Sequence, residues 1–155
     1  MYEKIMVPLD GSELAECVLP HMEGLIKGCH VSNVVFVRVA QPPVPPSHYG
    51  EVSISPEIYE ETESARKAEA KDYLDQIKNR LKYEGTELHS EVLVGRVADS
   101  LADYAEKNDI DLILIATHGR SGVTRWVRGS IADKILRSSN APVLMVRAPG
   151  TKGGI

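Results

Sequence analysis

The sequence contains little of what redox, zinc-binding and membrane-spanning proteins depend on. Its two cysteines, Cys17 and Cys29, match neither a CxxC pair nor a zinc framework, so we expect both to be reduced packing residues. No apolar run approaches the roughly 20 residues that cross a bilayer. The first residues, 1–10, lack the basic and apolar regions of a signal peptide. We therefore expect a cytoplasmic protein with no membrane partner.

An excess of positive charge is also missing. The formal net charge is -4, which argues against a nucleic-acid partner bound through a broad basic surface. Hydrophobic residues make up 43% and charged residues 26% of the chain, close to the average of globular proteins. The length of 155 residues fits one domain. We expect that domain to cover 1–148 and to be followed by a flexible tail, 149–155.

Several motifs of nucleotide-dependent and catalytic proteins are absent. The sequence has no GxxxxGK[ST] loop and no GxGxxG after its first predicted strand, which disfavours a Walker A protein and a dinucleotide dehydrogenase. No second acid adjoins Asp10, as a phospho-accepting response regulator would need. The histidines show no paired spacing, and no Ser-His-Asp arrangement is evident. We therefore predict no metal ligands and no catalytic residues, and we expect that the protein is not an enzyme.

What the sequence does contain is a regular alternation of short aliphatic runs with amphipathic helical stretches. Strands are predicted at 4–9, 31–40, 87–95, 111–116 and 141–147. Helices are predicted at 12–28, 56–84, 97–108 and 130–139. Pro20 is in conflict with the first of these helices, because it removes a ladder bond and should kink the axis. The alternation predicts an α/β fold with a five-stranded, parallel, doubly wound (Rossmann-like) sheet and helices on both faces. For this sheet we expect the strand order 3-2-1-4-5.

A basic stretch, "THGRSGVTRWVRGS" (117–130), follows the fourth predicted strand and contains no acid. Doubly wound sheets bind ligands beyond the carboxyl ends of their strands, where this stretch begins. Its glycines allow backbone amides to approach an anion, and its end begins a predicted helix whose first amides are unpaired. These features favour an anion site. A solvated basic loop that packs against a partner is the alternative, and Trp126 fits either as a cover for the ligand or as an anchor for the partner.

Asp10 follows the first predicted strand, in "PLDGS". A carboxylate at this place can accept hydrogen bonds from ribose hydroxyls or ligate a metal. Alternatively, it caps the amides of the next residues, since Asp-Gly is a common turn pair. The spacing does not decide between these roles.

The residues at both ends of the chain carry a family resemblance. "KIMVPLDGSELAECVL" and "IDLILIATHGRSGVTRWVRGSIADKILRSSNAPVLMVR" resemble the universal stress protein (UspA-like) family, in its single-domain, nucleotide-binding branch. That branch has a pattern of Gly, two residues, Gly, nine residues, and then Gly-Ser or Gly-Thr. Gly119 and Gly129-Ser130 match this pattern, whereas Ala116 stands at the place of the first glycine.

The resemblance implies an ATP-binding protein of the stress response, with Mg²⁺ held through the phosphates. Adenine would lie against Val39, Ile115 and Ala116. Pro8, Leu9 and Asp10 would line the adenosine, with Asp10 on the ribose. The implied phosphate region comprises His118, Gly119, Arg120, Gly129, Ser130 and Ile131. The resemblance also implies a homodimer formed through the last strand, 142–147, which agrees with an apolar strand at a sheet edge that needs covering.

Two functions remain open at this point. The first is a sensor or regulator that binds an adenine nucleotide and hydrolyses it slowly at most. The second is a UspA-like dimer that binds no nucleotide and acts through protein partners, with the proline-rich loop 41–55 as a contact surface. Ala116 favours the second function, whereas Gly119 and Ser130 favour the first. An adenosine-pyrophosphatase type of enzyme is disfavoured, because the Ser-Gly-Gly loop expected after the first strand is missing.

Replacing Arg120 with alanine tests the anion site directly. A charged hydrogen bond to a phosphate contributes about 1.5–3 kcal/mol. Arg120→Ala should therefore weaken ATP binding by about ten- to a hundredfold, measured by isothermal titration calorimetry. Gly119→Val and Gly129→Val should abolish binding, because their side chains would occupy the place of the phosphates. Unchanged ATP affinity in all three variants would contradict the assignment.

Overall fold

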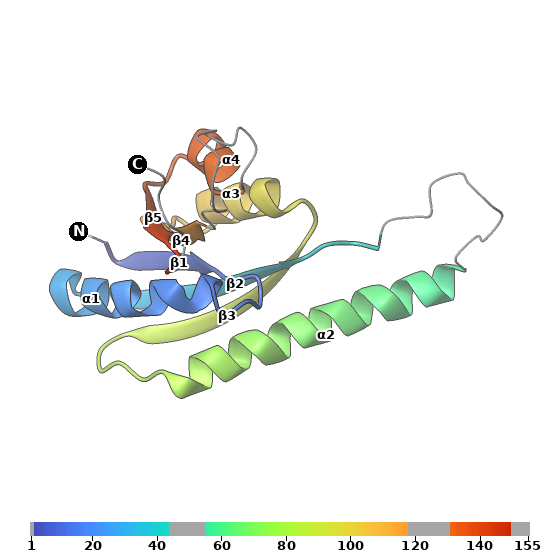
Figure 1. The fold of residues 1–155 in the computed structure, drawn as a ribbon, viewed down its shortest axis with the longest axis horizontal. Helices are drawn as coiled ribbons and strands as arrows, with labels where there is room; N and C mark the ends of the chain where they lie inside the picture. The colour runs from blue at the N-terminus through green and yellow to red at the C-terminus, as the bar shows by residue number, and fades with distance from the viewer. Residues whose placement is uncertain (1, 44–54, 118–130, 150–155) are drawn as a thin grey trace.

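The chain forms a five-stranded sheet with helices on both faces (Figure 1). The computed structural model describes residues 2–43, 55–117 and 131–149. The strands are β1 (Lys4–Pro8), β2 (Asn33–Ala40), β3 (Glu87–Val94), β4 (Leu112–Thr117) and β5 (Val143–Arg147). The helices are the 3₁₀-helix η1 (Ala15–Val18) and the α-helices α1 (Leu19–Cys29), α2 (Pro56–Arg80), α3 (Val97–Lys107) and α4 (Ile131–Ser138).

The strand order is β3-β2-β1-β4-β5, and each neighbouring pair is parallel. The predicted fold class and strand order are confirmed. The order reverses at β1, which pairs with β2 on one side and with β4 on the other. None of the helices among the described residues combines the length and apolar composition that crossing a membrane requires.

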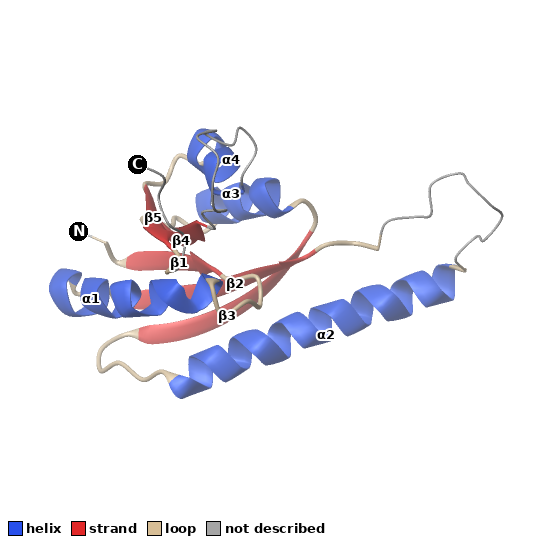
Figure 2. Ribbon diagram, in the orientation of Figure 1, coloured by secondary structure: helices blue, strands red, loops and turns tan. Residues whose placement is uncertain are grey.

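Two apolar layers hold the sheet between its helices (Figure 2). Because side chains alternate along a strand, consecutive residues of β1 serve different layers. Ile5 and Val7 pack on the side of α1 and α2, whereas Met6 packs on the side of α3 and α4. Phe36 of β2 and Ile113 of β4 are fully buried in the first and second layer, respectively. Burial on both faces explains why the central strands are continuous apolar runs.

The predicted helix 12–28 is wrong in its first half. Residues Ala15–Val18 form a turn of 3₁₀-helix, and the α-helix begins only at Leu19. Pro20 therefore lies in the first turn of α1, where its missing N–H removes no ladder bond. No kink is needed, since the proline starts the helix instead of interrupting it. The helix ends at Cys29, not at Gly28 as predicted, and the next residue, His30, adopts the left-handed conformation (φ 57°).

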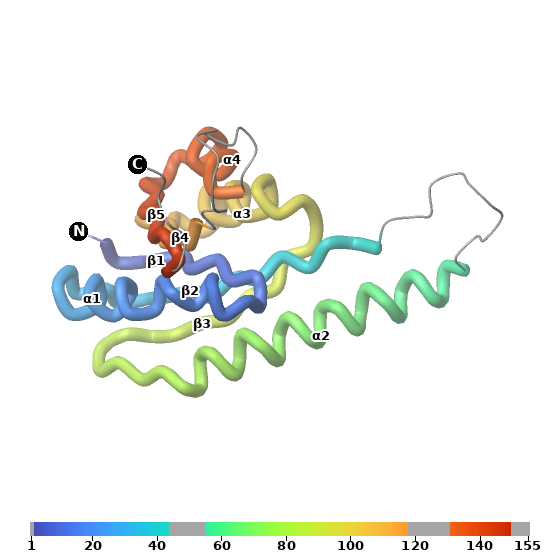
Figure 3. The backbone as a smooth tube through the Cα atoms, in the orientation of Figure 1, coloured from blue at the N-terminus to red at the C-terminus, as the bar shows by residue number. Residues whose placement is uncertain are grey.

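The long helix α2 is shorter at its end than the predicted 56–84. Leu81 is extended (φ -109°, ψ 137°) and stops the helix after Arg80. At the other end Ser55 caps the helix, since its side chain accepts a hydrogen bond from the Ile58 amide at 3.4 Å. Figure 3 shows α2 running along β2 and β3 and extending past the strands at its first turns. Its buried residues, Ala70, Leu74 and Ile77, all lie in the second half.

Some sequence predictions fall outside the described residues. They include most of the proline-rich loop, the basic stretch from His118 to Ser130, and the tail 149–155 apart from Pro149. The predicted helix 130–139 is observed as Ile131–Ser138.

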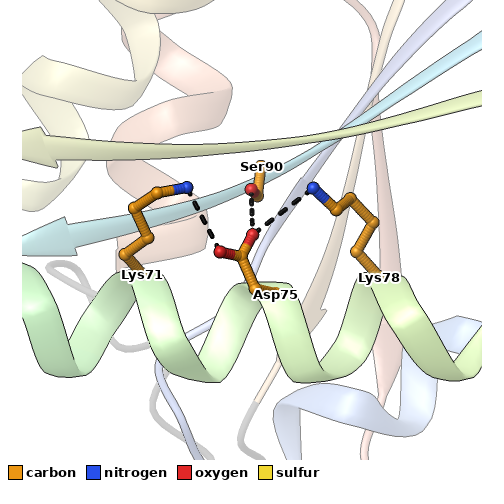
Figure 4. Close-up of polar contacts among 4 residues, drawn as sticks. All are labelled: Lys71, Asp75, Lys78 and Ser90. Atoms are coloured by element: carbon orange, nitrogen blue, oxygen red, sulfur yellow. Dashed lines mark hydrogen bonds and ion pairs between the residues drawn. The ribbon is translucent and has the colours of Figure 1, made fainter.

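Asp75 connects the second half of α2 to the edge strand β3 (Figure 4). The hydroxyl of Ser90 donates to Asp75 Oδ1 at 2.7 Å. Lys71 Nζ lies 3.2 Å from Oδ2, and Lys78 Nζ lies 3.4 Å from Oδ1. The hydrogen bond from Ser90, followed by the two lysines, lowers the pKa of Asp75. The ionised carboxylate is thus preferred in the folded state.

Ser90→Ala should reduce the free energy of unfolding by about 1 kcal/mol near neutral pH, because the carboxylate loses its shortest hydrogen bond. A lowered folded-state pKa stabilises the fold above the unfolded-state value of about 3.9, and this contribution is lost as the pH falls through the folded-state pKa. The cost of Ser90→Ala should therefore shrink below that pH. Urea unfolding of the wild type and Ser90→Ala, with and without Asp75→Asn, measures the effect. An equal cost of Ser90→Ala in the presence and absence of Asp75 would contradict the role.

Candidate functional site

A cavity of about 730 Å³ lies where the carboxyl ends of the strands meet α3 and α4. The turns after β1 and β2 contribute to its wall, and so do α3, which follows β3, and α4, which follows β4. This is the position that a doubly wound sheet predicts for a ligand. The described residues that line the cavity are Pro8, Leu9, Asp10, Ala15, Val37, Arg38, Val39, Gln41, Val97, Leu101, Ile115, Ala116, Thr117, Ile131, Ala132, Asp133, Leu136, Arg137, Met145 and Arg147.

The cavity combines apolar walls with a few charged groups. Aliphatic side chains from the strand ends and from α3 and α4 form most of its lining. Its charged residues, among those described, are two aspartates and three arginines: Asp10, Asp133, Arg38, Arg137 and Arg147. An apolar pocket with a few polar groups suits a ligand that has a flat hydrophobic part and an anionic part. The volume also falls within the ordinary range for small-molecule sites.

Asp10 forms the tight turn that follows β1. Its Oδ1 accepts hydrogen bonds from the Ser12 amide at 2.9 Å and from the Ser12 hydroxyl at 2.6 Å. The Ser12 hydroxyl oxygen in turn accepts from the Ala15 amide at 3.2 Å, which leads the chain into η1. The capping role is thus present, and Asp10 is also exposed and lines the cavity. Capping and ligand contact are therefore compatible.

Gly11 allows this turn to lie directly against Arg38. The residue has a φ of +89°, in the left-handed region that favours glycine. A Cβ on Gly11 would lie 3.1 Å from Arg38 Cζ and Nη1 and 3.2 Å from Nη2. Because the three distances are nearly equal, the flat face of the guanidinium must face the turn. Any side chain at Gly11 would press on that group.

Arg38 is held from α2 as well. Its Cζ lies 5.3 Å from the centre of the Tyr73 ring, and its Nη2 lies 3.3 Å from Glu69 Oε1. The arginine side chain is only 22% exposed, so both contacts act in a partly desolvated place. The guanidinium is therefore packed among three groups: the turn at Gly11, an aromatic ring and a carboxylate.

Tyr73 extends this arrangement to η1. Its hydroxyl donates to Glu16 Oε1 at 3.2 Å, and Arg80 Nη2 donates to Glu16 Oε2 at 2.8 Å. Burial raises the pKa of Tyr73 strongly, and the neighbouring Glu16 raises it further. The phenol consequently stays protonated and donates its hydrogen bond throughout the physiological pH range.

A second charged pair lies across the cavity on α4. Arg137 Nε lies 3.2 Å from both carboxylate oxygens of Asp133, one helical turn earlier. Arg147, which ends β5, stands in register with Thr117 at the end of β4. Positive charge thus occurs on both sides of the cavity, at Arg38 and at the pair of arginines on α4 and β5.

The structure brings seven of the twelve predicted site residues together around the cavity. They are Pro8, Leu9, Asp10, Val39, Ile115, Ala116 and Ile131. The other five, His118, Gly119, Arg120, Gly129 and Ser130, lie outside the described residues. The described part of the chain also contains no group of three or more His, Cys, Asp or Glu residues that could hold a metal ion.

Sequence reasoning missed several residues of the cavity, and Arg38 is the most informative of them. One signal was available, because a single arginine interrupts the otherwise apolar run of β2, "NVVFVRVA". A charge in a central strand needs a partner. Arg137 and Arg147 gave no comparable signal, since exposed arginines near a helix end or strand end are common.

Comparison with known proteins identifies relatives over nearly the whole chain. The family model for the universal stress protein family matches residues 1–147. Universal stress protein MJ0531 of Methanocaldococcus jannaschii is 28% identical over 150 residues, covering 96% of this chain and 84% of the relative. The solved structure of MJ0577, from the same organism, is 27% identical with a TM-score of 0.76, covering 97% of this chain and 99% of the other.

A more distant structure shares the fold. A universal stress protein family protein from Arabidopsis thaliana, solved with AMP bound, has a TM-score of 0.61 at 13% identity and covers 97% of this chain and 95% of its own. The strand order, the cavity at the strand ends and the match over 1–147 agree with one another. The chain belongs to the universal stress protein family.

Proposed function

We propose that the protein binds an adenine nucleotide, with ATP as its ligand, in the cavity at the carboxyl ends of the strands, and acts as a sensor or regulator in a stress response. The observation that carries the proposal is the cavity itself, which joins apolar walls to Asp10 and three arginines. Membership of the universal stress protein family supports the stress-response role. The bound AMP of the Arabidopsis relative supports the ligand class.

The chemistry of the wall suggests how the nucleotide would lie. Val39 and Ile115 offer apolar side chains for the adenine ring, and Ala116 lies next to Ile115 in the cavity wall. Asp10 is placed to accept hydrogen bonds from the ribose hydroxyls. Ile131 begins α4, so phosphates near it would face the first amides of a helix, which favour an anion.

The proposal also covers the metal ion and the fate of the bound nucleotide. Mg²⁺, in this proposal, is held through the phosphates. We assign no general base, and the proposal is of a protein that binds ATP and hydrolyses it slowly at most. In this proposal, nucleotide binding acts by changing the stability of the protein or the surface that it presents to partners, and not by forming a chemical product.

Ala116 stands at the place of the first glycine of the family pattern and is part of the cavity wall. The residue is 8% exposed and belongs to the apolar layer on the side of α1. The proposal therefore requires that the nucleotide fit beside this methyl group.

Native mass spectrometry of the purified, undenatured protein tests the function. We expect co-purifying adenine nucleotide, or a rise in melting temperature when ATP is added. At a hundredfold excess over Kd the stabilisation should be about 2.7 kcal/mol. The double variant Val39→Asp and Ile115→Asp should not be stabilised by ATP, because it places charge where adenine would lie. Sulfate, an unrelated anion, serves as the ligand control. Absence of nucleotide together with no shift would favour the alternative, a dimer that acts through protein partners.

The sheet edge at β5 supports a homodimer formed through residues 142–147. Leu144 is 41% exposed, which leaves an apolar side chain accessible on this edge strand, whereas Met145, 45% exposed, lines the cavity. The opposite edge strand, β3, exposes Glu87, His89 and Glu91, and charges of this kind discourage pairing. Of the two edges, β5 is thus the one suited to a second copy.

Leu144→Lys should convert the dimer into a monomer, because it brings a charge into the paired edge. Light scattering coupled to size-exclusion chromatography measures the mass. Val94→Lys is the matched control, since Val94 is also 41% exposed but lies on β3. The proposal fails if the wild type is a monomer or if both variants keep the same dimer.

A further inference from the structure

We infer that Arg38 is a positioning residue for the nucleotide site, which sets the place of the Asp10–Ser12 turn and couples it to α2. The inference rests on the proposed function, because it assigns to the turn the binding of the ribose. It concerns a residue that lines the cavity through the end of β2 but whose guanidinium is engaged elsewhere.

The first step of the argument is contact. The guanidinium lies face-on against Gly11, at 3.1–3.2 Å from the place of a Cβ. Gly11 stands between Asp10 and Ser12, the two residues that form the hydrogen-bonded turn. A shift of the guanidinium therefore leaves the middle of that turn without support, and the Asp10 carboxylate moves with it.

The second step is that the guanidinium has little freedom of its own. Tyr73 and Glu69, one turn apart on α2, hold it by ring contact and by an ion pair of 3.3 Å. Tyr73 is fixed in turn by its hydrogen bond to Glu16 of η1, the helix that follows the turn. Arg38 thus contacts the turn directly, and Glu16 fixes the position of Tyr73, which contacts Arg38.

The third step is chemical. A planar guanidinium can support a turn across its whole face and still bond to a carboxylate at its edge. Lysine offers a charge but no flat face, and methionine offers a stem but no charge. Arg38 is therefore not replaceable by either, although neither substitution leaves a large hole.

The consequence for ligand binding is specific to the ribose. If Arg38 acts through Asp10, its loss affects only nucleotides whose hydroxyls Asp10 can bind. A group that contacts the phosphates or supports the whole fold would affect all adenine nucleotides alike. Comparing ATP with 2′,3′-dideoxy-ATP separates the two cases.

Arg38→Met and Arg38→Lys should each bind ATP about tenfold more weakly than the wild type. A loss of about this size is typical of residues that are coupled within one network of contacts. Their affinity for 2′,3′-dideoxy-ATP should change less than about twofold, measured by isothermal titration calorimetry. Arg66→Met is the matched control. It removes another arginine of α2, which donates at 2.9 Å to the carbonyl of Gln41, a cavity-lining residue directly after β2. Because this bond joins the same helix to the cavity wall without involving Asp10, Arg66→Met should change the affinities for ATP and 2′,3′-dideoxy-ATP by the same factor.

A milder variant keeps the test valid if Arg38 variants fold poorly. Glu69 has a side chain that is 73% exposed, so Glu69→Gln should fold normally and show a smaller loss with the same dependence on the ribose hydroxyls. Equal losses for both nucleotides, or no loss for either, would overturn the inference and leave nucleotide binding intact. A wild type that binds neither nucleotide would overturn the proposed function as well.

Discussion

The pairing of β1 between β2 and β4 is the constraint on which the rest of the structure depends. Ile5 and Met6 of β1 stand opposite Leu112 and Ile113 of β4, and the other edge of β1 pairs with β2 along its whole length. The Asp111 carboxylate strengthens the start of this pairing by accepting from the Glu3 and Lys4 amides at 2.9 and 2.8 Å. Because the order reverses here, the chain leaves β1 and β4 toward opposite faces and opens a cavity between them.

The charged groups around that cavity fall into two sets: some line the cavity, and others connect its wall to α2. Asp10, Arg137 and Arg147 line it and carry the charges that face its interior. Arg38 and the groups behind it, Tyr73 and Glu16, connect the turn after β1 to α2. A long helix that packs on one face of the sheet thereby reaches the ligand side through a chain of side-chain contacts.

The strands could be predicted from the sequence more accurately than the ends of the helices. Apolar runs such as "DLILIA" predicted buried parallel strands because both faces of a central strand must be apolar. The start of the first helix was predicted too early, because a sequence pattern does not distinguish a proline inside a helix from one in its first turn, where Pro20 lies. Leu81 likewise continues a helical spacing, yet the chain turns there to reach β3, and only packing imposes that turn.

What the sequence determined by itself was the parallel α/β fold and the region of the candidate site, because periodicity and strand-end position are local and regular; the expected strand order agrees with the structure but does not follow from periodicity. Pro8, Leu9 and Asp10 could be placed at the site on those grounds. Only the tertiary structure decided that Ala116 faces the core and that Arg38, Gly11 and Tyr73 pack together. These contacts join β1, β2 and α2, segments far apart in the chain, and no local pattern carries information on how distant side chains meet.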